Sequence, residues 1–77
     1  MSGAKYNQKT RDWYTKLLDG KTTEEKIESL ELAERQKYHY YCDCSANFTT
    51  EQDADFNSQW NEILEMIKEL KESLKQN

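Results

Sequence analysis

The sequence predicts a small all-α protein in which a short first helix packs on an antiparallel hairpin of two longer helices. Its 77 residues include no Val, no Pro, two Gly and three Ile, so the β-branched apolar side chains that favour strands are scarce. Helix-favouring residues such as Glu, Lys, Leu, Gln and Ala are abundant instead. Apolar residues also recur every three or four positions, which is the spacing of one helix face. A chain of this length is expected to form a single domain.

The first helix is expected over about residues 7–19. Asn7 is a suitable N-cap, and Gly20 supplies the left-handed residue that commonly ends a helix. The spacing i, i+3, i+4, i+7, i+8 places one apolar stripe on this helix, formed by Thr10, Trp13, Tyr14, Leu17 and Leu18.

The second helix is expected over about residues 23–45. Thr22 and Glu25 have the spacing of a capping box, in which each side chain accepts a hydrogen bond from the backbone N–H of the other residue. Acidic residues in the first turn also complement the helix dipole. The apolar side of the helix is expected to contain Ile27, Leu30, Ala33, Tyr38 and Tyr41.

The third helix is expected over about residues 50–75, after a break at residues 47–48 and a second cap signature over residues 49–53. Its apolar residues are spaced 4, 3, 4, 3 and 4 apart, which is the pattern of a heptad seam. The seam consists of Phe56, Trp60, Ile63, Ile67, Leu70 and Leu74.

The seam predicts how the second and third helices meet. Folding them back on each other places Tyr41 opposite Phe56 and Leu30 opposite Ile67. The alternative is a coiled-coil-type homodimer, in which the same seam packs against a second copy of the chain and has a structural role.

Charge is distributed unevenly along the chain, whose net charge is −4. Residues 1–21 contain five cations and two aspartates, whereas residues 38–67 contain six acidic residues and no Lys or Arg. On the third helix, acidic residues form one stripe opposite the seam: Asp55, Glu62, Glu65, Glu69 and Glu72. Such a stripe is either a solvated outer face or a surface that steers toward a basic partner or imitates a phosphate backbone.

The segment YHYYCDC, residues 38–44, contains the single His and both Cys of the chain. A structural zinc site usually takes four ligands from two separated pairs, and no second pair is present, so a complete site would need carboxylates or a second molecule. A disulfide between Cys42 and Cys44 would be strained, and nothing around it indicates a redox protein. We therefore predict no metal, no cofactor and no enzymatic activity.

The same segment is better explained by packing and binding. Tyr38 and Tyr41 are expected to face the hairpin, and Cys42 to fill the end of the helix as a small apolar residue. Four successive aromatic rings cannot all face one neighbour, so His39 or Tyr40 is expected to cover the first helix or to face solvent. Exposed aromatic residues are typical anchors of protein interfaces.

These features predict a small acidic module that acts as an inhibitor, adaptor or regulatory subunit of a larger protein with a basic surface. Compact acidic antagonists of host machinery, including virus-encoded ones, are similar in size and charge. Tyr38, His39 and Tyr40 are the expected anchors, and the acidic stripe is the expected steering face. The alternative is a nucleic-acid-associated regulator that uses the basic and aromatic first helix, although the negative net charge opposes direct binding. Without an apolar leader or membrane span, a cytoplasmic location with reduced cysteines is expected.

Overall fold

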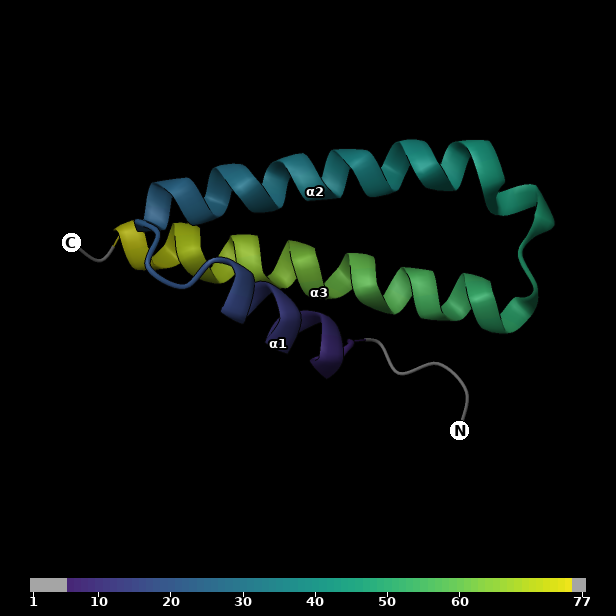
Figure 1. Ribbon diagram of the computed structural model, residues 1–77, viewed down its shortest axis with the longest axis horizontal. Coiled ribbons are helices and arrows are strands. Elements are labelled where there is room, and N and C mark those ends of the chain that lie inside the picture. The colour runs from purple at the N-terminus through teal and green to yellow at the C-terminus, as the bar shows by residue number, and fades with distance from the viewer. Residues whose placement is uncertain (1–5, 76–77) are drawn as a thin grey trace.

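The computed structural model describes residues 6–75, which form helices joined by short connections (Figure 1). The elements are α1 (Gln8–Leu17), α2 (Thr23–Cys44), the short 3-10 helix η1 (Ser45–Asn47) and α3 (Thr50–Lys75). No strand occurs within this part of the chain, and the predicted all-α class is confirmed.

Local hydrogen bonds define where α1 begins and ends. The Asn7 side chain accepts a hydrogen bond from the Thr10 backbone N–H at 2.9 Å, as expected of an N-cap. After the helix, Gly20 has a φ of 86°, a left-handed conformation that costs glycine little because it has no Cβ. The helix ends at Leu17, two residues before the predicted end.

Both longer helices begin with reciprocal caps. The Thr22 hydroxyl accepts from the Glu25 N–H at 3.2 Å, and the Glu25 carboxylate accepts from the Thr22 N–H at 3.0 Å. At the start of α3, Thr49 and Gln52 make the same pair of hydrogen bonds at 3.1 and 2.9 Å. These caps satisfy N–H groups that have no partner inside the helix.

The two long helices lie side by side and run in opposite directions, and α1 lies against α3 (Figure 1). Because a helix of this length extends about 39 Å, α3 sets the longest dimension of the molecule, which is 43 Å. Polar contacts join α2 and α3 along their length through four residue pairs: Glu31–Lys71, Glu34–Trp60, Lys37–Gln59 and Tyr41–Asp53.

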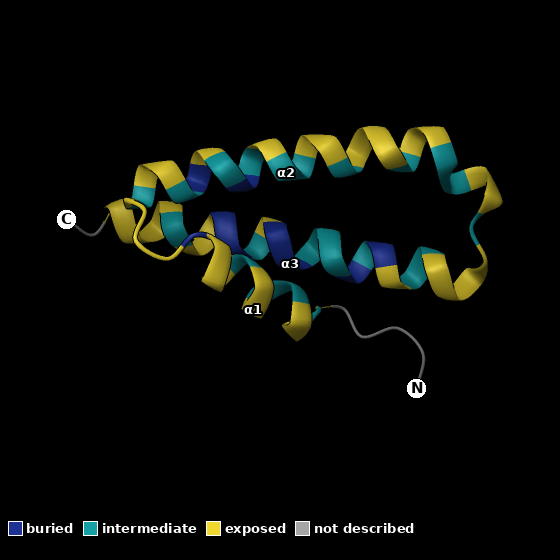
Figure 2. Cartoon of the chain, in the orientation of Figure 1, coloured by how far each residue is buried: buried dark blue, intermediate teal, exposed yellow. Residues whose placement is uncertain are grey.

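The core lies where the three helices meet, and it is not evenly distributed along α2 and α3. Its members are Leu18, Leu30, Ile63, Met66 and Ile67, with Tyr14 and Leu70 packed against them. In α2 the buried residues are Ile27 and Leu30, both in the first half of the helix (Figure 2). The second half of α2 therefore leaves most of its surface open.

Helix α3 is buried on two faces. The seam contributes Phe56, Ile63 and Ile67 to the interior, while Leu74 at its end is exposed. A second set of residues is buried as well, namely Ser58, Glu62 and Met66. Helix α1 and its N-cap cover part of this second face, because Asn7 and Arg11 both donate hydrogen bonds to Glu62. None of the helices in the described part of the chain combines the length and apolar character needed to cross a lipid bilayer.

Candidate protein interaction surface

The end of the molecule formed by the α2–η1–α3 connection contains the aromatic residues of the YHYYCDC segment. Tyr41 packs inward, with its ring stacked on Phe56 at a centroid distance of 4.9 Å. Its hydroxyl donates to Asp53 Oδ1 at 2.6 Å, which raises the pKa of the Tyr41 phenol because the bond favours the protonated form. Tyr41 is thus a structural residue of this end.

Its neighbours Tyr38 and Tyr40 remain about half exposed, at 49% and 54%. Tyr40 contacts Phe48 and Phe56, with ring centroids 6.0 and 6.4 Å away. Tyr38 lies on another side of α2, with its ring 6.3 Å from that of Trp60. We call these two residues with exposed His39 the aromatic tip.

Cys42 does not occupy the position that the sequence predicts. Cys42 is exposed and does not fill the helix end, because α2 continues to Cys44 and no other element covers Cys42. Both thiols are free. A hydrogen bond with Cys42 raises the pKa of the Tyr38 phenol. Within residues 6–75 no group of three or more His, Cys, Asp or Glu side chains is arranged to hold a metal ion.

The acidic stripe of α3 is not one solvated face, and this prediction is wrong for Glu62. Glu62 is only 3% exposed. Its Oε1 accepts from the Asn7 backbone N–H at 3.0 Å, and its Oε2 accepts from Arg11 Nε at 2.7 Å. The physical reason is that α1 lies on this part of α3 and brings donors to the carboxylate.

Arg11 joins two members of the predicted stripe. Its terminal nitrogens donate to both oxygens of Glu69 at 2.9 Å, in addition to the bond from Nε to Glu62. The bond to Arg11 lowers the pKa of the Glu69 carboxyl, and the two carboxylates raise the pKa of Arg11. We call this set of contacts the Arg11 clamp. It holds α1 on α3, so Glu62 and Glu69 have intramolecular partners.

The other predicted steering residues occupy different surroundings. Asp55 is exposed, and its Oδ2 accepts from Gln59 Nε2 at 2.8 Å. Glu72 is exposed near the end of α3, and Glu65 is half-buried. Asp43 and Glu51, which lie outside the predicted stripe, are both exposed.

Sequence reasoning missed a second surface, which lies between α1 and α2. Trp13, Leu17 and Leu32 are all more than half exposed, although the first two belong to the stripe predicted to face the protein. A hollow of about 210 Å³ lies among them, and its lining also includes Tyr14 and Ala33. We call this surface the α1–α2 groove.

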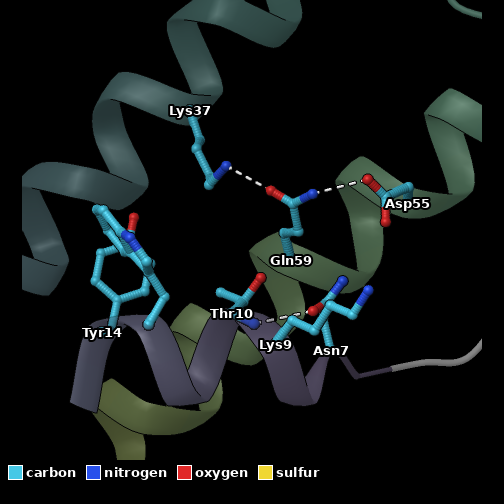
Figure 3. A pocket seen from close by; sticks show the side chains of 8 residues that line it. Asn7, Lys9, Thr10, Tyr14, Lys37, Asp55 and Gln59 are labelled. Carbon is cyan, nitrogen blue, oxygen red and sulfur yellow. Dashed lines mark hydrogen bonds between the residues drawn. The ribbon is translucent and has the colours of Figure 1, made fainter. Parts of the chain in front are cut away.

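The groove continues toward the tip as a larger, more polar hollow of about 580 Å³ (Figure 3). Trp13 and Tyr14 line both hollows. Lys37 from α2 points across the polar hollow and donates to Gln59 Oε1 at 2.9 Å. Lys9 and Asp55 also line it.

One signal in the sequence points toward this groove. Leu32 falls between Leu30 and Ala33 of the predicted face of α2, so it has no place in the hairpin interface. Apolar residues left over from a predicted interface are candidates for a second one.

Comparison of the chain with models of known protein families, with curated proteins and with solved structures finds no match.

Proposed function

We propose that this protein acts by binding and not by catalysis, as an inhibitor, adaptor or regulatory subunit of a larger protein. The observation that carries this proposal is the aromatic tip, where Tyr38 and Tyr40 stay half exposed beside the inward-facing Tyr41. Large, rigid aromatic side chains with a polar end are enriched among the residues that dominate binding energy in protein interfaces.

The arrangement of α2 supports this proposal. In α2, residues 31–44 include no buried residue, yet this stretch carries three tyrosines. Tyr40 packs one side against Phe48 and Phe56, and Tyr38 lies beside Trp60, yet each keeps about half of its surface exposed. A partner that covered the exposed rings would remove apolar surface from water, which is the main favourable term in association.

Charge near the tip favours a partner with a basic surface. Between Lys37 and Lys68 the chain contains no Lys or Arg. Asp43 and Glu51 are both exposed in this interval, and Lys37, which lines a hollow with Tyr40, is the cation that precedes the tip in sequence. Complementary charge at the rim of an interface mainly increases the rate of association.

The test begins with the tagged full-length chain immobilised and exposed to a nuclease-treated lysate, followed by washes at low and high salt. A recovered partner should bind Tyr40→Ala about tenfold more weakly or worse, as expected for an interface anchor. Leu64→Ala is the matched control, because Leu64 is an exposed apolar residue on α3 outside the tip and the groove. Equal retention of the partner by Tyr38→Ala, Tyr40→Ala and the control would refute the proposed anchors.

The contribution of charge is measured separately on the purified partner. Asp43→Lys combined with Glu51→Lys should lower the association rate constant at low salt and leave the dissociation rate nearly unchanged. The difference between this variant and wild type should shrink as salt rises. An association rate that is independent of both salt and these substitutions would exclude acidic steering.

A further inference from the structure

The α1–α2 groove contains a set of exposed apolar residues that the aromatic tip does not use. Trp13 and Leu17, one helical turn apart on α1, are 59% and 54% exposed. Leu32 on α2 is 53% exposed, and all three line the same hollow. No charged residue lines this end of the groove. The surface is therefore apolar, concave and bounded by two helices.

The other end of the groove contains a cation without an ion-pair partner. Lys37 is half-buried, and its Nζ donates to the neutral amide oxygen of Gln59 and lies 5.4 Å from the centre of the Phe56 ring. None of the ion pairs among the described residues includes Lys37. Burial lowers the pKa of Lys37, and the charge of Asp55 opposes this effect only in part. A carboxylate placed beside Lys37 would compensate for its lost hydration.

The charges around Lys37 indicate where such a carboxylate would sit. Asp55 lines the same hollow, but its Oδ2 accepts from Gln59 Nε2, on the far side of the amide from Lys37 (Figure 3). Lys9, from α1, contributes a second ammonium group to the lining. An acidic group of a ligand would thus be attracted to Lys37 and repelled by Asp55.

We propose that the α1–α2 groove binds an amphipathic α-helix of a partner protein, with the apolar stripe of that helix packed among Trp13, Leu17 and Leu32 and an acidic residue of it paired with Lys37. A helix fits because the walls of the groove are themselves helices and α3 forms part of its floor through Gln59. The bound helix would complete a four-helix arrangement in which apolar residues at i, i+3, i+4 and i+7 face the groove.

The apolar end of the groove contains no residue of the aromatic tip, while its polar end shares Lys37 and Gln59 with a hollow that Tyr40 lines. A protein with one surface for a basic partner and another for an acidic amphipathic helix would join two molecules. The groove thus gives the adaptor role, among those proposed above, a structural basis of its own, and it can be tested without knowledge of the partner at the tip.

The test uses a displayed library of amphipathic helical peptides, selected against the full-length protein and counter-selected against Leu32→Glu. Leu32 is exposed, so this variant should remain folded, which circular dichroism verifies. If it does not, Leu17→Glu on the opposite wall replaces it. Leu64→Glu is the matched control for a charge introduced at an exposed leucine elsewhere.

We expect enriched peptides to share a bulky apolar stripe and at least one flanking Asp or Glu. Fluorescence anisotropy should show that Trp13→Ala weakens binding roughly 30-fold, as for an aromatic anchor. Lys37→Gln should weaken binding of an acidic peptide about 5- to 10-fold. Lys37→Gln should change little the affinity for the same peptide with Gln in place of its acidic residue. Leu64→Glu should bind like wild type.

Several results would overturn the proposal. They are the absence of enrichment, enrichment of basic peptides, and equal binding of the selected peptides to wild type and Trp13→Ala. Sedimentation equilibrium tests whether a second copy of the chain fills the groove. A wild-type dimer that Leu32→Glu dissociates would show that it does. Retention of an oligonucleotide that Trp13→Ala abolishes would assign the groove to nucleic acid. None of these results depends on Tyr38 or Tyr40, so the two proposals can fail independently.

Discussion

Replacing Arg11 with Met should strongly destabilise the protein, because the Arg11 clamp compensates a buried carboxylate. The Glu62 side chain is only 5% exposed, and Arg11 Nε lies 2.7 Å from its Oε2. Without Arg11, Glu62 would keep the Asn7 backbone N–H as a donor but no cation. Removing one partner of a buried ion pair costs about 3–5 kcal/mol.

The expected cost here is smaller, because the Arg11 side chain is 29% exposed and water can reach the site once it is removed. We therefore expect a loss of about 2–3 kcal/mol. A domain of this length has a free energy of unfolding of about 4–12 kcal/mol. The clamp thus accounts for a large fraction of the total, and its loss should lower Tm by about 10–20 °C.

The assay is thermal unfolding followed by circular dichroism at fixed salt. Lys16→Met is the matched control, because Lys16 is an exposed cation of α1 outside the ion pairs of the described chain. The double variant Arg11→Met with Glu62→Leu should recover part of the stability, since it leaves no buried charge without a partner. A Tm for Arg11→Met equal to that of Lys16→Met would refute this account of the clamp.

Three further predictions concern pH, the core and the caps. The bond to Arg11 depresses the pKa of Glu69, so it stabilises the fold above the ordinary carboxyl pKa of 4.5, and this contribution is lost as pH falls through the lower folded value. Glu69→Gln should therefore flatten the fall of Tm on acidification, measured in a pH series. Leu30 is fully buried, so Leu30→Ala should cost about 2–5 kcal/mol in urea unfolding. The same change at exposed Leu64 should cost no more than about 0.5 kcal/mol. In the same urea unfolding assay, Thr22→Ala should lower the free energy of unfolding by about 1 kcal/mol, because the cap of α2 is lost. Thr22→Ser should lower it much less.

The helices and their caps can be predicted from the sequence because they depend on local interactions. The Asn7 and Thr22 caps join groups three residues apart, so spacing alone identifies them. The all-α class follows from composition and from the spacing of apolar residues in the same way. The seam of α3 also identifies Phe56, Ile63 and Ile67 as buried.

The surroundings of the acidic residues on α3 could not be predicted in this way. Carboxylates on one helix face have the same sequence pattern whether they meet water or a basic helix of the same chain. The difference depends on where α1 lies, and contacts distant in sequence determine that position, such as Leu18 on the core and Arg11 on Glu62. An excess of acidic residues in one helix and of basic residues in another is thus also a signal for internal pairing.

The tyrosines of the tip show a related limit. Periodicity places Tyr38 and Tyr41 on the same side of α2, yet only Tyr41 is held by a stacked ring and a carboxylate. Tyr38 sits at the edge of the interface, next to Trp60. Helical spacing identifies the direction of a side chain but not how far the neighbouring helix extends to cover it.

The position of α1 links the clamp to the α1–α2 groove, because α1 supplies Trp13 and Leu17 as one wall. If α1 leaves α3, the groove loses that wall, and the apparent affinity for a bound helix is the intrinsic affinity multiplied by the fraction of molecules in which α1 is docked. Arg11→Met should therefore weaken peptide binding although Arg11 does not line the apolar end of the groove. At the same free peptide concentration, peptide should in turn raise the Tm of Arg11→Met less than that of wild type, since weaker apparent binding gives less stabilisation. Hydrogen exchange of the α1 amides reports how often α1 leaves α3, so bound peptide should increase their protection. Protection of α1 that does not change with peptide would show that the groove and the clamp are independent.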